Sequence, residues 1–284
     1  MTITSQSTLC EVGEMKKSKK KKYLLMCSGG KDSVATLLLA WLNKEPLDEV
    51  VYVRVMFDKT TSGEHPEQDS YIEEILKPWV ENTLRVPFRI LTGDKTYKDL
   101  FTRTVSRGKL KGLQGGYLLT GLCGMNRDGK VNPVRDYINL LREQSWDVYQ
   151  YVGIAKDEPK RLERLNDHKI SLLAKYGYTE KRAKALVEQY GLLSPVYEFS
   201  DRNGCFFCPN CKDSELANLI NNNLPLFNKW LSLEYQAKKE LAYPYFKMGH
   251  RSLVGEAHRL HRQGLLNRRL VWVDFTGVKR HDEE

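Results

Sequence analysis

Two short segments hold most of the side chains that could do chemistry. The first is SGGKDS at 28–33, in which two glycines precede a lysine, an aspartate and a serine. Glycines let a backbone approach an oxyanion closely, and the helix that follows offers free N–H groups and a favourable dipole. Lys31 adds a positive charge, and Ser28 and Ser33 add hydroxyl donors. The segment therefore predicts a phosphate-binding loop.

This loop differs from two well-known phosphate loops. It is not a Walker A loop, because Gly30 and Lys31 are followed by Asp32 and the upstream glycine is missing, and it is not GxGxxG. The alternative is a Gly-Gly turn with a capping Asp or Ser between a strand and a helix. An apolar strand before the loop and an apolar helix after it favour the phosphate site.

The second segment is CFFCPNC, which spaces three cysteines two residues apart, at Cys205, Cys208 and Cys211. Two-residue gaps let several thiolates converge on one metal centre. Four ligands are usual, so a fourth must come from elsewhere in the chain. A [4Fe–4S] cluster and a Zn²⁺ ion both fit, and the alternative is three free cysteines in a turn.

A third segment, GIAKDEPKR at 153–161, follows an apolar strand. Its Lys and Arg side chains could bind phosphate or sulfate oxygens, and Arg161 suits a bidentate contact. Asp157 and Glu158 are either a charge pair at a helix N-terminus or a Mg²⁺ site that works through substrate phosphates. For Lys160 and Arg164 we prefer a solvated position on the helix that follows.

Strands and helices alternate along the first half of the chain, which predicts a doubly wound, mostly parallel α/β sheet of Rossmann-like type. Ligands bind such sheets at the carboxyl ends of the strands, where both SGGKDS and GIAKDEPKR fall. We predict strands at 23–27, 50–56, 86–91 and 147–154, a short strand at 117–120, and helices at 34–42, 68–84 and 132–144. The predicted division is a disordered basic leader (1–22), an α/β nucleotide-binding domain (23–160) and a helical, Cys-rich region (161–284).

Composition restricts the class of protein. The chain has 284 residues with a mean hydropathy of −0.52, and no run approaches the roughly 20 apolar residues of a membrane span. Without an apolar leader, and with crowded cysteines, the protein is expected to be cytoplasmic. The net charge of +9 arises partly from six lysines in 16–22. This tail and the Arg-rich C-terminal sequence both fit a nucleic-acid partner. The alternatives are a solvated extension for the tail and an amphipathic helix for the C-terminal sequence.

The segment SGGKDS resembles the SGGxDS signature of PP-loop proteins, the adenine nucleotide alpha hydrolases. Over roughly residues 22–230 the chain is most similar to the phosphoadenosine phosphosulfate (PAPS) reductase-like family, which is related to DNA phosphorothioation sulfurtransferases. The resemblance also rests on HPE at 65–67, GLCGMNRDGK around Cys123, GIAKDEPKR at 153–161 and RNGCFFCP at 202–209.

The resemblance implies roles for individual residues. The loop would bind pyrophosphate and GIAKDEPKR would face the nucleotide, which makes the predicted nucleotide-binding residues Ser28, Gly29, Gly30, Lys31, Asp32, Ser33, Lys156, Asp157 and Arg161. The predicted catalytic residues are Lys31, Asp32 and Arg161. Cys123 would be the fourth metal ligand beside Cys205, Cys208 and Cys211, and the resemblance favours [4Fe–4S] over Zn²⁺.

The implied function is an enzyme that binds ATP or a related adenylyl nucleotide with Mg²⁺ and cleaves between the α- and β-phosphates. The adenylation would serve sulfur chemistry, with a sulfur donor protein as partner and nucleic acid as one class of acceptor. One alternative is a PAPS or adenylyl sulfate reductase that releases sulfite, although thioredoxin-dependent reductases carry a C-terminal Glu-Cys-Gly and here no cysteine follows Cys211. Another is a nucleotide-binding subunit of a mobile-element or defence nucleoprotein complex.

Overall fold

The centre of the computed structural model is a five-stranded parallel sheet of order β3-β2-β1-β5-β6. The structure describes residues 19–117, 123–237, 240–247 and 250–267, and the backbone of two short strands at 272–273 and 279–280. The strands of the sheet are β1 (Lys20–Cys27), β2 (Glu49–Arg54), β3 (Phe88–Thr92), β5 (Trp146–Tyr151) and β6 (Lys169–Ile170).

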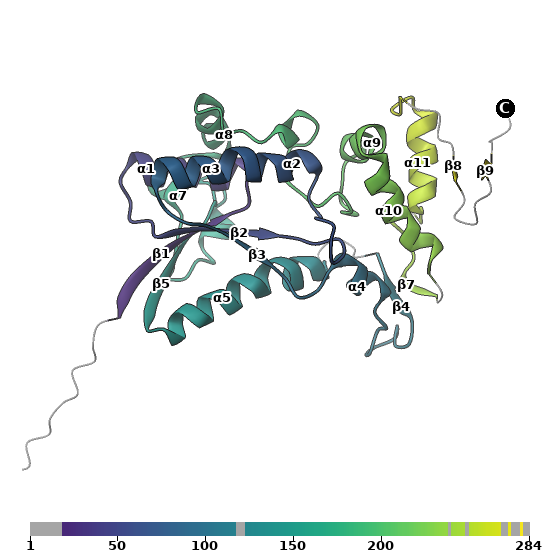
Figure 1. Ribbon diagram of the computed structural model, residues 1–284, viewed down its shortest axis with the longest axis horizontal. Coiled ribbons are helices and arrows are strands. Elements are labelled where there is room, and N and C mark those ends of the chain that lie inside the picture. The colour runs from purple at the N-terminus through teal and green to yellow at the C-terminus, as the bar shows by residue number, and fades with distance from the viewer. Residues whose placement is uncertain are drawn as a thin grey trace, which may run out of the picture.

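Helices cover both faces of this sheet (Figure 1). On one face lie α1 (Lys31–Leu42), α7 (Leu172–Lys175) and α8 (Glu180–Gln189), which share a core with Leu25 and Val50. On the other face α5 (Asn132–Glu143) packs two buried side chains, Ile138 and Leu141, against the sheet. Two faces covered by crossover helices confirm the predicted doubly wound α/β class.

The first strand begins at Lys20, three residues before the predicted start, and so takes in part of the predicted leader. Lys20, Lys21 and Lys22 pair in parallel with the start of β5. The Lys21 and Lys22 ammonium groups lie 5.3 and 5.5 Å from the ring centroids of Tyr149 and Trp146. Backbone pairing and these ring contacts stabilise the basic run Lys20–Lys22 as part of the strand. The rest of the leader, 1–18, lies outside the described residues.

The predicted helix at 68–84 is one continuous helical stretch in which the hydrogen-bond pattern changes along its length. It consists of α2 (Pro66–Ser70), the π-helical η1 (Tyr71–Leu76), α3 (Lys77–Trp79) and the π-helical η2 (Val80–Leu84). Pro66 suits the first position of a helix, because a missing N–H costs nothing there. The stretch ends at Arg85, whose φ is 58°.

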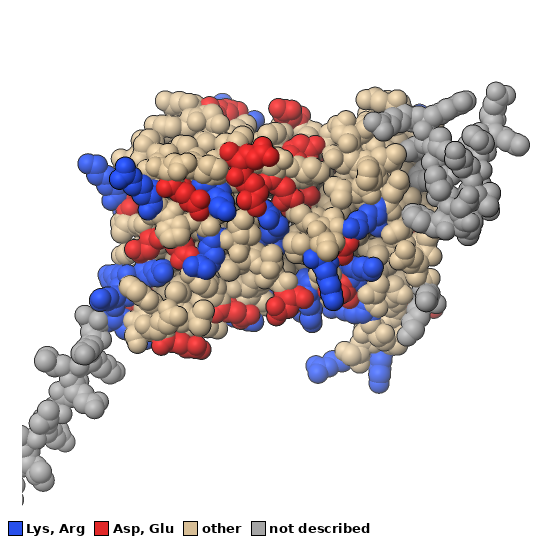
Figure 2. All heavy atoms as spheres, viewed as in Figure 1, with Lys and Arg blue, Asp and Glu red and all other residues tan. Residues whose placement is uncertain are grey.

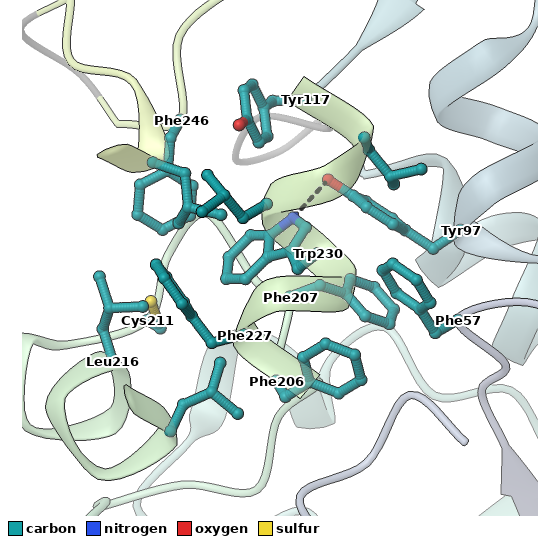
Figure 3. Close-up of a cluster of buried hydrophobic side chains, with 14 of the residues drawn as sticks. Phe57, Tyr97, Tyr117, Phe206, Phe207, Cys211, Leu216, Phe227, Trp230 and Phe246 are labelled. Atoms are coloured by element: carbon teal, nitrogen blue, oxygen red, sulfur yellow. Dashed lines mark hydrogen bonds between the residues drawn. The ribbon is translucent and has the colours of Figure 1, made fainter. Parts of the chain in front are cut away.

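Beyond the sheet, three helices form a second layer: α9 (Asp213–Asn222), α10 (Leu224–Tyr235) and α11 (Leu253–Arg262) (Figure 1). They enclose an aromatic cluster around Trp230 (Figure 3). A parallel two-stranded sheet, β4 (Gln114–Gly116) with β7 (Leu241–Tyr243), borders it. The predicted strand at 117–120 is not found at Tyr117, which follows β4, and 118–120 lie outside the described residues.

The remaining elements are short. Among the described helices, none has the length and apolar character that crossing a bilayer requires. The short elements are α4 (Tyr97–Thr102), the π-helical η3 (Asn126–Val131), α6 (Pro159–Leu162), the 3₁₀ helix η4 (Pro195–Glu198), β8 (Trp272–Val273) and β9 (Lys279–Arg280).

Candidate functional site

The candidate site lies where the direction of the sheet reverses, between β1 and β5. From β1 the chain builds β2 and β3 on one side and later β5 and β6 on the other, so the loops after β1 and β5 leave a crevice. A cavity of about 560 Å³ opens there. Its walls come from the loop after β1, from 152–161 after β5, and from a third segment at 197–203.

The loop after β1 requires its two glycines for different reasons. Gly29 has φ +72°, and a Cβ there would lie 2.2 Å from Nε2 of Gln68. Only glycine tolerates both conditions. Gly30 has extended torsions and caps α1 without a side chain. The two serines hold the turn, because Ser33 Oγ accepts from the Ser28 N–H at 3.1 Å and donates to the Gly30 carbonyl at 2.9 Å.

The end of β5 approaches the start of α1 very closely. A Cβ on Gly153 would lie 2.8 Å from the carbonyl carbon of Asp32 and from the backbone nitrogen of Ser33. Glycine therefore lets the end of β5 and the start of α1 touch backbone to backbone. The sequence contained this residue as the first of GIAKDEPKR, but the reason for it appears only when β1 and β5 lie side by side.

Several charged side chains of the cavity are paired with one another. Lys31 Nζ lies 2.8 Å from Asp32 and 2.8 Å from Glu180, and Arg161 pairs with Glu158. Burial alone would lower the pKa of Lys31, but hydrogen bonds to the two carboxylates outweigh it and the pKa is raised. The pKa of Asp32 is also raised, first by burial and also by Glu180 and Glu158, against the effect of Lys31.

Lys156 and Asp157 do not belong to the cavity wall that Arg161 and Glu158 join. Both side chains are exposed, and Asp157 Oδ1 instead accepts from the N–H of Glu180, the first residue of α8. The Lys156 N–H donates to the Tyr178 carbonyl. Arg161 thus lines the loop cavity, whereas the Asp157 side chain caps the start of α8.

Several residues of the site lie far from it in sequence, and sequence reasoning missed them. The Tyr197 hydroxyl accepts from the Lys31 N–H at 2.9 Å, across 166 positions. Gln68 is buried, accepts from Ser194 Oγ at 2.6 Å and reaches the Ser28 carbonyl at 3.5 Å. Arg202 and Asn203 also line the cavity. These two residues begin the segment RNGCFFCP, on which the family resemblance partly rests, but sequence reasoning assigned neither of them a role.

A second cavity of about 350 Å³ lies beside the first, at the ends of β1, β2 and β5. The two cavities share Met26, Ser28, Val152, Lys169 and Asn203. The second is the more apolar, because several valines line it; its polar wall contains Tyr52, Glu64 and Lys130. Burial raises the pKa of Glu64.

The Cys-rich segment packs between this second cavity and the aromatic cluster. The backbone of Cys205 forms an isolated antiparallel β-bridge with that of Glu64, and the Phe206 N–H donates to the Gly63 carbonyl at 2.9 Å. Two tight turns follow, closed by the Cys208 N–H on the Cys205 carbonyl and by the Cys211 N–H on the Cys208 carbonyl. Cys123, Cys205 and Cys208 all pack against the cluster, and Cys211 is buried in it. The tertiary structure thus brings the four predicted ligands to one region.

Proximity does not make a finished metal site. Within the described parts of the chain, no three Cys, His, Asp or Glu side chains lie close enough to hold a metal ion. Burial raises the pKa of the Cys205 thiol and raises that of Cys211 to about 12. The side chains as placed therefore do not fit a bound cluster or Zn²⁺.

The HPE segment lies at the start of α2, outside both cavities. His65 is buried beside Phe199, with ring centroids 5.3 Å apart, and burial lowers its pKa. Glu67 Oε1 lies 3.4 Å from the side-chain amides of Asn218 and Asn223. These contacts join the start of α2, to which the segment belongs, to α9.

No protein-family model matches this chain. No curated protein matches it either. Among solved structures, the chain is similar to the U34-tRNA thiolase NcsA from Methanococcus maripaludis with its [4Fe–4S] cluster, at 17% identity and a TM-score of 0.37. The match covers 76% of this chain and 70% of the thiolase. At this level of similarity neither a shared fold nor a shared function follows.

Proposed function

We propose that this protein is a PP-loop-type enzyme that binds ATP or a related adenylyl nucleotide and cleaves it between the α- and β-phosphates. One observation carries the proposal. At the switch point of the sheet, a glycine loop at the N-terminus of α1 shares a cavity with four cationic side chains, Lys31, Arg161, Lys169 and Arg202. Backbone N–H groups, a helix dipole and cations converging on one cavity favour a polyanion.

The pairing of charges supports a nucleotide that arrives with Mg²⁺. Asp32, Glu158 and Glu180 balance the cations of the cavity. A phosphate chain that replaces them as partner of Lys31 and Arg161 releases carboxylates, and carboxylates with phosphate oxygens are ligands that Mg²⁺ prefers. Bound Mg²⁺ would neutralise charge on the departing pyrophosphate. Lys31 and Arg161 would hold the phosphates in place, and Asp32 would be one of the carboxylates released towards Mg²⁺.

The second cavity supports the choice of a nucleotide over a simple anion. It is apolar and adjoins the loop cavity through Ser28 and Asn203. A heteroaromatic base fits an apolar cavity beside a phosphate site, since its faces gain from leaving water and its edges find polar groups. The substrate class is therefore a purine nucleotide with its phosphates on the loop.

The activated product would serve sulfur chemistry, with a sulfur donor protein as partner and nucleic acid as the acceptor class. The motive is the cysteine-bearing segment, which follows Arg202 and Asn203 of the cavity walls in sequence and packs against the aromatic cluster. Lys and Arg side chains also gather where β1 begins and beside β4 (Figure 2), as a phosphate backbone requires. The metal assignment, [4Fe–4S] or Zn²⁺ on Cys123, Cys205, Cys208 and Cys211, stays a prediction.

Two substitutions at one position test the nucleotide assignment. Gly30→Ala adds a Cβ that meets the nearest side-chain atoms at 3.3 Å, so a small adjustment accommodates it, whereas Gly30→Trp fills the loop cavity. We expect wild type to bind ATP at micromolar to millimolar Kd, Gly30→Ala to weaken binding by about tenfold or less, and Gly30→Trp to abolish it. Calorimetry measures the affinities, and chromatography detects AMP and pyrophosphate. Unchanged ATP binding by Gly30→Trp refutes the assignment.

The metal assignment has its own test. If the cluster assignment is right, anaerobically purified protein is brown and contains iron and sulfide, whereas colourless protein with about one zinc per chain decides for Zn²⁺. Cys205→Ser and Cys208→Ser should lose the metal in either case. Full retention by Cys123→Ser would exclude that residue as the fourth ligand, and protein without metal would refute the site.

Cys27 provides an observation against the reductase alternative. It is the described cysteine nearest the loop, it is 4% exposed, and burial raises its pKa. A reductase needs an exposed thiol of lowered pKa. We therefore expect no thioredoxin-dependent sulfite release from PAPS or adenylyl sulfate, and strong sulfite formation would establish that alternative. Tight nucleotide binding and co-purified nucleic acid, without either activity, would favour the nucleoprotein subunit.

A further inference from the structure

Asn203 stands where the two cavities meet, and its side chain has no hydrogen-bond partner among the residues that the structure describes. It lines both cavities. Both polar atoms of its amide, Nδ2 and Oδ1, are buried, and neither makes a hydrogen bond with a residue that the structure describes. Buried polar groups are nearly always hydrogen-bonded. An amide unsatisfied at both ends is therefore suited to a partner that the chain does not supply.

The amide lies against the phosphate loop. A Cβ on Gly30 would lie 3.6 Å from Nδ2 of Asn203. A ligand that extends from the loop cavity into the apolar cavity must pass the shared wall, to which this side chain belongs together with Met26, Ser28, Val152 and Lys169. The position is the boundary between the predicted phosphate site and the predicted base site.

The backbone around Asn203 is held on both sides. The Ser200 hydroxyl accepts from the Arg202 N–H at 3.2 Å and donates to the Arg202 carbonyl at 2.7 Å. Two residues after Asn203, the backbone of Cys205 is held by its β-bridge to Glu64. Only the Asn203 side chain is left to turn, and turning it towards a ligand breaks no hydrogen bond within the described chain.

We propose that Asn203 recognises the sugar hydroxyls of the nucleotide whose phosphates occupy the loop, which makes it a specificity-determining residue. This inference rests on the proposed function. A phosphate oxygen only accepts hydrogen bonds, so it satisfies Nδ2 and leaves Oδ1 without a partner. A sugar hydroxyl both donates and accepts, so it satisfies both ends of the amide. In a nucleotide the sugar also lies between phosphate and base, as Asn203 lies between the two cavities.

The recognition has a measurable consequence. A site built to hydrogen-bond a hydroxyl rejects the analogue that lacks it, because the amide then stays buried and unpaired. The same reasoning predicts that Asn203→Ala does not destabilise the protein, since it removes a polar group that has no partner. A ligand-binding role can therefore be distinguished from a structural one. If Asn203 binds the ligand, Asn203→Ala lowers the affinity for ATP while its melting temperature stays the same or rises.

The test compares ATP, 2′-deoxy-ATP, 3′-deoxy-ATP, ITP and pyrophosphate on wild type, Asn203→Ala and the matched control Asn139→Ala, an exposed Asn on α5. We expect wild type to bind at least one deoxy analogue about tenfold or more weakly than ATP. Asn203→Ala should bind ATP about tenfold more weakly, bind ATP and that analogue equally, and retain its affinity for pyrophosphate. Asn139→Ala should behave as wild type.

Other outcomes would overturn the inference. Asn203→Ala that still prefers ATP to the deoxy analogue, or that instead loses a preference for ATP over ITP, excludes sugar recognition. A fall in melting temperature with equal loss of all ligands assigns Asn203 a structural role. If wild type binds pyrophosphate but discriminates no nucleotide, this inference fails and the loop assignment survives. If wild type binds no phosphate ligand, the proposed function itself fails.

Discussion

The loop cavity and the aromatic cluster around Trp230 are built from opposite kinds of side chain. In the cavity, ionic groups are partly exposed and paired, as in Lys31 with Asp32 and Glu180. In the cluster, rings are almost fully buried and touch face or edge, as in Tyr97 stacked on Phe207 with centroids 4.1 Å apart (Figure 3).

The difference lies in what holds each region together. The cavity is shaped by backbone: the left-handed Gly29, the close approach of Gly153 and the hydrogen bonds of Ser33. Its charged side chains are consequently free to exchange partners with a ligand. The cluster is shaped by side-chain packing, where each ring contributes to stability. Substitutions should therefore affect ligand binding in the first region and stability in the second.

The largest expected effect is on stability, from Trp230→Ala. Trp230 is fully buried, packs edge-on against Phe246 at 4.9 Å, and donates from Nε1 to the Tyr97 hydroxyl at 3.3 Å. The cavity left behind should lower the free energy of unfolding by about 4 kcal/mol, measured by urea denaturation. Leu140→Ala, at a half-exposed position on α5, should change it by less than about 0.5 kcal/mol. Similar losses in both variants would contradict the assignment of the core.

An effect on binding without one on stability is expected from Arg161→Ala. Arg161 lines the loop cavity, whereas the adjacent Lys160 does not, so Lys160→Ala is a control of equal charge. Losing a charge-assisted phosphate contact of about 2 kcal/mol should weaken ATP binding about 30-fold. Neither variant should shift the melting temperature by more than about 2 °C. Equal weakening by the two variants would show that general charge, not a contact, accounts for binding.

The smallest expected effect is that of Asp213→Asn, which removes the charged partner that the first residue of α9 gives to Arg259 of α11. Asp213 lies 2.6 Å from Arg259 and 3.2 Å from Lys247, and the hydrogen bond from Arg259 lowers its pKa to about 2. A carboxyl whose pKa is lower in the folded than in the unfolded protein stabilises the fold when the pH is above the unfolded pKa. This stabilisation is lost as the pH falls through the folded pKa. Discounted for exposure, the loss should be about 1 kcal/mol at pH 7, vanishing from about pH 4 to pH 2. A loss that persists at pH 2 would mean packing, not charge.

Much of the site could be predicted from sequence because its signals are local. A Gly-Gly loop between an apolar strand and an apolar helix, and cysteines two residues apart, express their geometry within a few residues. The C-terminal end of α1 and the bounds of α5 follow from the same local patterning, whereas α1 begins at Lys31, three residues before the predicted start. Lys156 and Asp157 show the limit of this reasoning: they lie in the expected segment, but the turn before α6 directs them away from the cavity.

Sequence alone determined the class of sheet, the position of the loop and the chemical types at the site, because each depends on periodicity or on adjacent residues. Only the tertiary structure decided which distant side chains complete the site. Tyr197 reaches Lys31 and Asn203 reaches Gly30 because the segment after α8 returns over the end of β1. Contacts across more than 160 positions are set by how whole elements pack, and no local pattern records that packing.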